Sequence, residues 1–522
     1  MKITYLFPIT AALLILLFYL GLPDLKNLPQ KEDFLPQGSH WTRRDSLFLS
    51  LLTLVYAAVA FSNLGDMQAP QTVRSLDGES AVVTLDGEYS IDRAMIYTGI
   101  GQGSYTFEYS ADGEKWYGAA YFEQGHAALL KWQELDLEDA PNMAVRYVRI
   151  CGTGAAEIGE VALFNAYGEL LPISSDCPEL CDEQALIPAE ATYLNSSYFD
   201  EIYHARTAYE HLHGTAPYET SHPPLGKVIM SLGIAIFGMV PFGWRVMGAL
   251  AGILMLPAMY LLGKQLTKKS SFAFAAALML ALDCQHFTQT RIATIDSYPV
   301  LFILFSWLFM LRFMQRDIVR LPLKKLLPDL ALSGLFMGLG IASKWIGVYS
   351  GAGLAVAFFW TIFRHMRMAA ASAHLLKTDK SLSDEDRKIL TLRDQTTMKR
   401  VLVICLWCLL FFVAIPLAIY LLAYIPYFAY AHFDNLKDYL TAVWNAQLSM
   451  FSYHSKPGLG MDHPFYSPWY EWIFNQRPMY YASPTYVNTP GWSYAIWCFG
   501  NPAIWSAALV GFAYTVFMWA KR

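Results

Sequence analysis

About nine apolar runs constrain the fold of this chain more than any other feature of its sequence. A helix needs about 20 mostly apolar residues to cross the hydrocarbon layer of a bilayer, and each run has that length or nearly so. The runs cover approximately residues 3–20, 46–63, 243–262, 271–287, 297–313, 328–343, 346–363, 401–425 and 502–520. Since 55% of the residues are hydrophobic and only 16% are charged, the sequence predicts an α-helical polytopic membrane protein.

Basic residues between the runs predict the orientation of the chain. Lys and Arg cluster at positions 43–44, 264–269, 312–325, 364–400 and 521–522. The positive-inside rule places these clusters in the cytoplasm, so alternation of the spans places residues 64–242, 288–296, 344–345 and 426–501 outside. The run at 3–20 resembles a signal-peptide core, but no small-residue cleavage site follows it, so we expect an anchor. The net charge of −5 gives no reason to expect a nucleic-acid partner.

Residues 68–171 differ in composition from the rest of the chain. Short alternating runs such as "SYTFEYSADGEKWYGAAYF" and "VRYVRICG", separated by Asp-Gly and Gly turns, predict an inserted all-β sandwich. The pattern resembles the discoidin-like, galactose-binding-like modules that accompany carbohydrate enzymes, which implies sugar binding; a spacer is the alternative. The predicted organisation is transmembrane helices in 1–67, the sandwich in 68–171, a catalytic outer loop in 172–242, a transmembrane bundle in 243–425, an outer loop in 426–501 and a last transmembrane helix in 502–522.

Titratable residues recur where the predicted spans open on the outer side. A charge near lipid is costly, so such residues are usually functional. The stretch "YFDEIYHARTAYEHLHGTAPYETSHPPLGK", residues 198–227, contains adjacent carboxylates and four histidines. The candidate site residues in this and the other outer segments are Asp200, Glu201, Arg245, Arg291, Asp296, Lys344, His463 and Arg477.

The two adjacent acids predict a particular chemistry. Neighbouring positions on a helix point about 100° apart, so Asp200 and Glu201 cannot both address one atom and must differ in role. They therefore do not form a glycosidase-type pair. A sugar phosphate leaves as a stabilised anion, so one carboxylate base and cations on the phosphate suffice for its transfer. Outside the membrane, where nucleotides are scarce, a lipid-linked sugar phosphate is the donor that fits.

A series of motifs resembles the protein O-mannosyltransferases that use dolichyl- or polyprenyl-phosphate-mannose. The motifs are "FDEIYHARTAYEHLHG", "SHPPLGKVIMSLGIAIFGMVPFGWRVMGALAG", "LALDCQHFTQTRIATIDSYPVLF", "ASKWIGVYS", "YHSKPGLGMDHPFYSPWYEWIFNQRPMYY" and "GNPAIW", which extend from about residue 193 to about residue 510. The resemblance implies a GT-C fold with juxtamembrane helices at 199–213 and 223–240. It also implies inverting, metal-independent transfer, without a cofactor, to Ser or Thr of an extracytoplasmic protein at the cell membrane.

The resemblance also implies residue roles. Asp200 matches the first acid of the family's Asp-Glu motif and would be the general base, and Arg245 would hold the lipid phosphate. The sequence departs from the family pattern in two ways: family members usually continue for further spans after the Gly-Asn-Pro segment, and the inserted sandwich is unusual.

Alternatives to this interpretation follow from the same residues. The histidines at 204, 211, 213 and 222 suggest a metal, but residue 213 lies off the helix face that 204 and 211 share, so none is expected. The aromatic stretch "PFYSPWYEW" fits either sugar stacking or an interfacial belt. The other functions compatible with the sequence are transfer of another sugar to a lipid or cell-wall polymer, and a non-enzymatic glycan-binding membrane protein.

Overall fold

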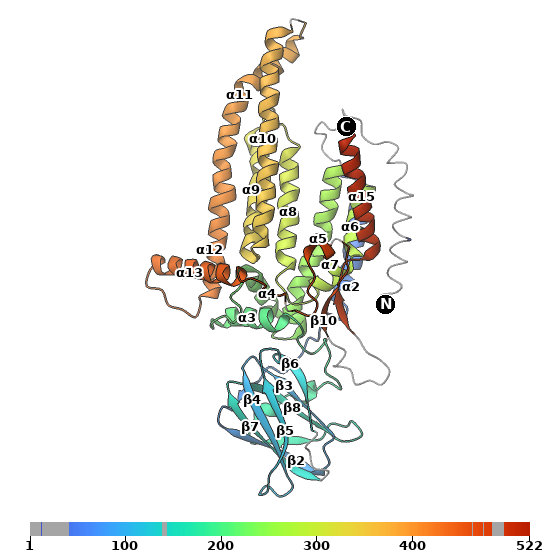
Figure 1. Cartoon of the computed structure of the whole chain (residues 1–522), viewed down its shortest axis with the longest axis vertical. Coiled ribbons are helices and arrows are strands. Elements are labelled where there is room, and N and C mark those ends of the chain that lie inside the picture. The colour runs from blue at the N-terminus through green and yellow to red at the C-terminus, as the bar shows by residue number, and fades with distance from the viewer. Residues whose placement is uncertain are drawn as a thin grey trace.

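A helical bundle and a smaller β-sheet domain make up the computed structural model (Figure 1). The structure describes residues 12, 41–137, 144–379, 381–461, 463–472, 474–482 and 495–521. The sheet domain lies beyond one end of the bundle, and a layer of short helices lies between the two (Figure 1). The predicted fold class, a helical polytopic protein with an inserted β-rich domain, is confirmed.

Seven helical segments of the described residues are long and apolar enough to cross a membrane. They are α2 (Arg43–Phe61), α5 (Pro241–Thr267), α8 (Ser297–Met314), α9 (Leu323–Ser343), α10 (Ile346–Thr378), the continuous segment of α11 (Asp384–Leu409), η4 (Leu410–Ala414) and α12 (Ile415–Tyr427), and α15 (Pro502–Ala520). Each coincides with a predicted run. The predicted span at 3–20 lies outside the described residues.

The predicted span at 271–287 is wrong as a single helix. It consists of α6 (Ser270–Ala281) and the short α7 (Cys284–Thr290). At 1.5 Å per residue, α6 is about 18 Å long, less than the hydrocarbon thickness of about 30 Å. The helix breaks because the Asp283 carboxylate caps α7 at the amide of His286 (3.1 Å) and also accepts hydrogen bonds from Asn501 N (3.2 Å) and Trp505 Nε1 (2.8 Å).

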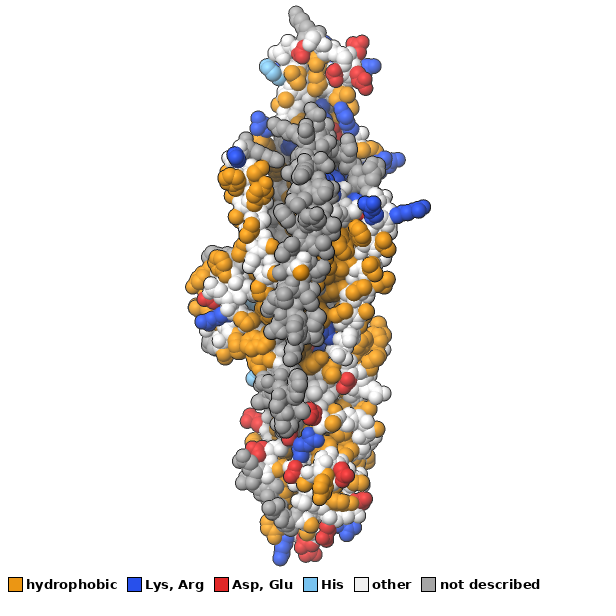
Figure 2. All heavy atoms as spheres, turned by 90° about the vertical axis from the view of Figure 1, so that its right-hand side faces the viewer, with side chains coloured by type: hydrophobic (Ala, Val, Ile, Leu, Met, Phe, Trp, Pro, Cys, Tyr) orange, Lys and Arg blue, Asp and Glu red, His pale blue; other side chains and the backbone are white. Residues whose placement is uncertain are grey.

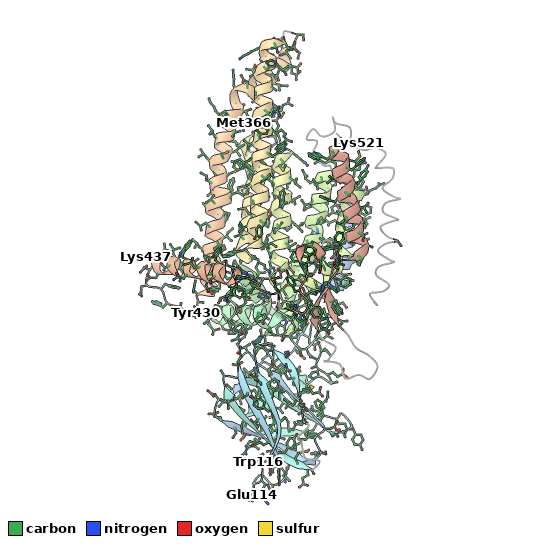
Figure 3. The ribbon with its side chains drawn as sticks, viewed as in Figure 1. Glu114, Trp116, Met366, Tyr430, Lys437 and Lys521 are labelled. Atoms are coloured by element: carbon green, nitrogen blue, oxygen red, sulfur yellow. The ribbon has the colours of Figure 1, made fainter. Side chains whose placement is uncertain are left out.

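The basic clusters gather at the end of the bundle away from the sheet domain. Lys264 pairs with Asp45 at 3.0 Å, near Arg43 and Arg44, and Arg393 pairs with Asp317 at 2.7 Å. Lys521 lies at the same end as Met366, whereas Tyr430 and Lys437 lie at the other end (Figure 3). On the face shown in Figure 2, Lys and Arg stand above a region in which apolar side chains dominate. This segregation of charge agrees with the predicted orientation of the spans.

The β-sheet domain consists of two antiparallel sheets with one shared core. One sheet has the order β1-β8-β3-β6 and the other β5-β4-β7-β2-β9. The core contains Val83, Phe107 and Ile150 from the second sheet and Ile96 and Val161 from the first, all at most 2% exposed. The strands are β1 (Arg74–Ser75), β2 (Ser80–Tyr89), β3 (Arg93–Thr98), β4 (Gly103–Ser110), β5 (Tyr117–Gln124), β6 (Lys131–Leu135), β7 (Val145–Gly154), β8 (Glu157–Phe164) and β9 (Ile173–Ser175). The short helices η2 (Pro178–Leu180) and η3 (Gln184–Leu186) follow them.

Two short helices, α3 (Glu201–His213) and α4 (Leu225–Phe237), lie between the bundle and the sheet domain, and a third helix, α13 (Leu436–His454), lies beside the bundle (Figure 1). Helices α3 and α4 pack on each other, and α3 lies across the end of the bundle (Figure 1). Helix α13 packs Val443 and Met450 against α12 and leaves Trp444 exposed. The loop after α13 contains α14 (Trp469–Trp472) and the strand β10 (Met479–Ala482), which pairs with β11 (Ile496–Cys498).

Candidate functional site

Asp200 lies directly before α3 and is half-buried. Its side chain does not cap the helix, and it has no hydrogen-bond or ion-pair partner among the residues that the structure describes. Burial raises the pKa of this carboxyl to about 6; the charges of Asp296 and Glu219 raise it as well, and Lys344 lowers it. A carboxylate that is unpaired, partly desolvated and accessible is suited to accept the proton of a substrate hydroxyl during the reaction.

Glu201 has the opposite environment. It is fully buried, and both of its oxygens are saturated with hydrogen bonds. Oε1 accepts from Arg245 Nε (2.7 Å) and Ala293 N (3.0 Å), and Oε2 accepts from an Arg245 amino group (2.7 Å) and Tyr198 N (3.2 Å). This carboxylate has no free lone pair directed at a substrate, so it holds α3 against α5 and the segment before α8.

Arg245 is likewise fully buried and fully used. Besides the two bonds to Glu201, its guanidinium donates to the carbonyl oxygens of Leu64 (3.0 Å), Tyr193 (2.6 Å) and Ser196 (2.9 Å). All five N–H donors of an arginine are thereby engaged. Among the described residues, the hydrogen bonds of Arg245 and Glu201 leave neither side chain a group to offer a ligand, so the roles of Arg245 as a phosphate ligand and of Glu201 as a catalytic residue stay predictions that this geometry does not support.

The accessible charges of the site belong to Asp296 and Lys344. Asp296 precedes α8 and Lys344 follows α9, so the antiparallel packing of these two helices brings the residues together. Lys344 Nζ lies 2.6 Å from Asp296 Oδ1, and the two side chains are 26% and 39% exposed. Burial raises the pKa of Asp296, but the Lys344 ammonium outweighs it and holds the pKa below its usual value.

Arg291 is half-buried and caps the end of α2. It donates to the carbonyl oxygens of Ala60 (3.1 Å) and Asn63 (2.7 Å), and its guanidinium carbon lies 4.6 Å from the centre of the Phe287 ring. Cations at a helix C-terminus stabilise the carbonyls that lack helical partners. The amino group that bonds to Asn63 O also donates to Ser62 O (2.5 Å), whereas the other amino group has no hydrogen-bond partner among the described residues, so Arg291 retains part of its donor capacity.

His463 and Arg477 lie in the loop between α13 and β10. His463 is exposed, and its Nδ1 accepts from Phe465 N at 3.2 Å. The Arg477 side chain is 59% exposed, lies 3.8 Å from Glu471 and donates to Tyr466 O at 3.1 Å. Within the described parts of the chain, neither residue contacts Asp200, Asp296 or Lys344. The loop approaches the site through Tyr481, whose ring centre is 4.3 Å from that of Phe199.

Sequence reasoning missed a buried ion pair beside the site. Lys227, at the start of α4, is fully buried and forms an ion pair with Glu219; it also donates to Glu219 O at 2.9 Å. Burial raises the pKa of Glu219, but Lys227 outweighs this and lowers it to about 2. The pair ties the loop after α3 to α4. The only sequence signal was the Lys at the end of the "SHPPLGK" stretch.

The histidines of this region lie in a row rather than in a ligand set. The ring centres of His204 and His222 are 6.4 Å apart, and those of His222 and His454 are 5.1 Å apart. Burial lowers the pKa of His204 to about 4 and that of His222 to about 3, so both are neutral at pH 7. His454 Nε2 lies 2.8 Å from Ser221 O, which joins α13 to the loop.

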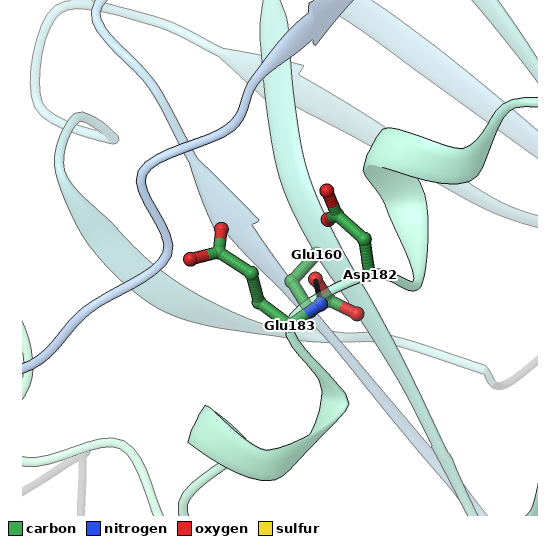
Figure 4. A group of neighbouring side chains, drawn as sticks. All are labelled: Glu160, Asp182 and Glu183. Carbon is green, nitrogen blue, oxygen red and sulfur yellow. Dashed lines mark hydrogen bonds between the residues drawn. The ribbon is translucent and has the colours of Figure 1, made fainter.

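The group of side chains with metal-ligand spacing lies in the sheet domain, as far as the described residues show. It consists of Glu160, Asp182 and Glu183 (Figure 4). Glu160 is fully buried, accepts from Glu183 N at 3.0 Å, and has a pKa raised by burial to about 7. Glu183 accepts from the amides of Gln71 (2.7 Å) and Thr72 (3.1 Å). Hydrogen bonds within the protein therefore explain why these three carboxylates lie close together.

Part of the helical bundle matches a known protein family. Residues 236–436 match the family described as Dolichyl-phosphate-mannose-protein mannosyltransferase. The predicted resemblance is confirmed. The matched segment contains Arg245, Arg291, Asp296 and Lys344, whereas Asp200 and Glu201 precede it.

Bacterial proteins with a related description are also similar to this chain. Polyprenol-phosphate-mannose–protein mannosyltransferases of Mycolicibacterium smegmatis and Mycobacterium tuberculosis are 24% and 25% identical over 356 and 360 residues, which is 60% of this chain and 64% of each relative. One from Corynebacterium glutamicum is 25% identical and covers 54% of this chain and 58% of its own length. The chain thus spans less than two thirds of these relatives.

A solved structure also matches part of the chain. It is the Saccharomyces cerevisiae protein O-mannosyltransferase Pmt1-Pmt2 complex bound to the sugar donor, with 18% identity and a TM-score of 0.35. The match covers 45% of this chain and 31% of the other.

Proposed function

We propose that this chain is an inverting glycosyltransferase of the GT-C type. It moves a mannosyl, or similar, residue from a polyprenyl or dolichyl monophosphate to Ser or Thr hydroxyls of extracytoplasmic proteins. The family match and the names of the mycobacterial relatives support the donor and the acceptor. In this proposal, the end of the bundle opposite the basic clusters lies on the extracytoplasmic side of the cell membrane.

The single observation that carries this proposal is the state of Asp200. It is the one acid of the adjacent pair whose carboxylate is unpaired among the described residues, and it stands beside the accessible Asp296–Lys344 pair. Asp200 accepts the proton of the acceptor hydroxyl as the new C–O bond forms. The lipid phosphate leaves from the opposite face of the sugar, which inverts the anomeric centre. No metal or cofactor takes part.

Lys344, with Arg291, holds the phosphate of the donor in place of Arg245. The Lys344 side chain is 26% exposed, and exchange of its Asp296 partner for a phosphate keeps its charge compensated. The remaining amino group of Arg291 adds a second donor. Preorganised cations of this kind stabilise the charge that develops on a leaving phosphate. His463 and Arg477, on the exposed loop, contact the substrate only if the loop folds over the site.

Replacing Lys344 by Gln tests this assignment. We expect KM for the lipid donor to rise about 10- to 100-fold, since a charge-assisted hydrogen bond contributes about 1.5–3 kcal/mol. Loss of the ammonium also removes an influence that lowers the pKa of Asp200, so the acid limb of the pH–rate profile moves to higher pH. Lys437→Gln, an exposed lysine on α13, is the matched control. An unchanged KM in Lys344→Gln would contradict the role.

The pH dependence of the wild-type protein follows from Asp200. A carboxylate base is active only when it is ionised, and burial raises its pKa to about 6. We therefore expect kcat/KM to fall about tenfold per pH unit below about pH 6 and to level off above it. Steady-state rates between pH 4.5 and 8 on one donor and one peptide measure this. A kcat/KM that stays constant between pH 6 and pH 4.5 would contradict a base with the raised pKa of Asp200.

The identity of the acceptor is tested by one labelling reaction. Membranes that contain the chain receive polyprenyl-phosphate-mannose with labelled mannose and a Ser/Thr peptide. Label in the peptide supports protein mannosylation, and label that partitions into lipid or polymer supports the alternative transfer.

The sheet domain binds carbohydrate in this proposal. Its exposed residues Tyr121 and Tyr167 offer ring faces on which a sugar can stack.

A further inference from the structure

The loop between β5 and β6, residues 125–130, is inserted into the helical layer that carries Asp200. Leu129 and Leu130 are 0% and 4% exposed, although they belong to the sheet domain. Their side chains share one buried cluster with residues of α3, α4, α5 and the segment before α8, namely Ala205, Ala208, Met230, Ile234, Trp244 and Ala293. The sheet domain therefore shares a hydrophobic core with the bundle at this point.

Hydrogen bonds fasten the same loop to the segment immediately before α3. Ser197 donates its hydroxyl to Leu129 O and its amide to Leu130 O at 2.9 Å. Trp132 N donates to Ser196 Oγ at 3.1 Å. Leu130 has a φ of 56°, in the left-handed region that a leucine rarely adopts, and its amide bonds to Thr98 O at 3.0 Å. A loop held in such a conformation by its surroundings is well determined.

These contacts bracket Asp200 along the chain. Ser197 is three residues before it, and Ala205 is five residues after it. The backbone that carries the carboxylate is thus fixed to the sheet domain on both sides, while Glu201 fixes it to α5 through Arg245. Within the part of the chain that the structure describes, no hydrogen bond restrains the side chain of Asp200 itself. Its position depends on where α3 lies.

We propose that the β5–β6 loop of the sheet domain holds α3 in its working position, with Leu129 and Leu130 as positioning residues for Asp200. This inference rests on the proposed function, and it assigns the inserted domain a role in catalysis besides any binding of glycans. The domain is then an integral part of the active site rather than a tethered module.

A shift of α3 changes the surroundings of Asp200 in a measurable way. The charged groups that influence it are Asp296 before α8, Lys344 after α9 and Glu219 in the loop after α3, and its burial has the largest effect. If α3 loosens, Asp200 gains contact with water, and its pKa falls toward that of an exposed aspartate. The acid limb of the pH–rate profile then moves to lower pH. A defect in folding alone lowers the amount of active protein without moving this limb.

The test compares Leu129→Ala with Leu170→Ala in the full chain, purified in lipid nanodiscs. Leu170 is a leucine of the same domain that is 38% exposed and lies outside the loop. We expect Leu129→Ala to lower kcat about tenfold or more, because small displacements of a catalytic group are costly. We also expect its acid limb to move down by about half a pH unit. We expect Leu129→Met, which keeps an apolar side chain of similar size, to have the wild-type kcat and acid limb. Leu170→Ala should change neither value.

Hydrogen exchange gives a second measurement that does not depend on activity. The amides of residues 201–213 exchange about tenfold faster in Leu129→Ala than in the wild type and in Leu170→Ala. If Leu129→Ala fails to fold, Ser197→Ala, which removes the hydroxyl bonded to Leu129 O, takes its place. A folded variant with unchanged kcat, acid limb and α3 exchange overturns the inference. If the wild type transfers no mannose, the proposed function fails, and the exchange of α3 alone decides whether the loop holds it.

Discussion

Asp200→Asn is expected to abolish mannose transfer and at the same time to stabilise the folded protein. Loss of a general base lowers kcat by about 10²- to 10⁴-fold. The substitution keeps the size of the side chain and removes only its charge. Transfer of labelled mannose to a peptide, measured at equal amounts of folded protein, tests the predicted loss of activity.

The stabilisation follows from the raised pKa of Asp200. Its pKa is about 6 in the folded protein and 3.8 in an unperturbed carboxyl, so the ionised form destabilises the folded state. This cost grows as the pH rises from about 4 to about 6 and is constant above, where it amounts to at most about 3 kcal/mol. Asparagine removes it, so the Tm in detergent at pH 7.5 rises, and the difference from wild type vanishes near pH 4.

Asp434→Asn is the matched control, because that carboxylate lies on the same side of the bundle and is 88% exposed. It should change neither the transfer rate nor the Tm. Wild-type activity in Asp200→Asn would rule out Asp200 as the base. A lower Tm in Asp200→Asn would show instead that the carboxylate forms a stabilising interaction in the folded state.

The second large effect concerns the neighbouring acid. Glu201→Gln or Arg245→Gln each leaves a buried charge without its partner, which costs about 3–5 kcal/mol. We expect neither single variant to accumulate as folded protein in membranes. The double variant Glu201→Gln/Arg245→Gln contains no uncompensated charge and should recover part of the lost stability. The amount of folded protein and the Tm of the three variants measure this coupling.

An exposed ion pair provides the comparison. Arg74 and Glu79 lie 3.1 Å apart, and their side chains are 46% and 62% exposed, so Glu79→Gln should cost less than about 1 kcal/mol. A folded Arg245→Gln protein with a normal Tm and a raised KM for the lipid donor would restore Arg245 to the role of phosphate ligand. The structure leads us to expect the loss of folding instead, because all five of its N–H donors are engaged within the protein.

The adjacent acids show how far sequence reasoning could go. The sequence predicts that Asp200 and Glu201 differ in role, since neighbouring residues of a helix point in different directions. The sequence could not show that Arg245 binds Glu201, because a guanidinium serves equally well for a phosphate or for a buried carboxylate, and the sequence pattern is the same in both cases.

The sequence by itself determined seven of the predicted spans and the presence of a β-rich insertion. These features follow from local composition: an apolar run of sufficient length must lie in lipid, and alternating residues punctuated by Gly form strands whatever lies elsewhere. Only the tertiary structure decided that the helix breaks at Asp283 between α6 and α7, that Glu201 neutralises Arg245 and that Leu129 reaches into the layer under α3. Each of these depends on residues tens to hundreds of positions apart, and it is the packing of the folded chain that selects which partners meet.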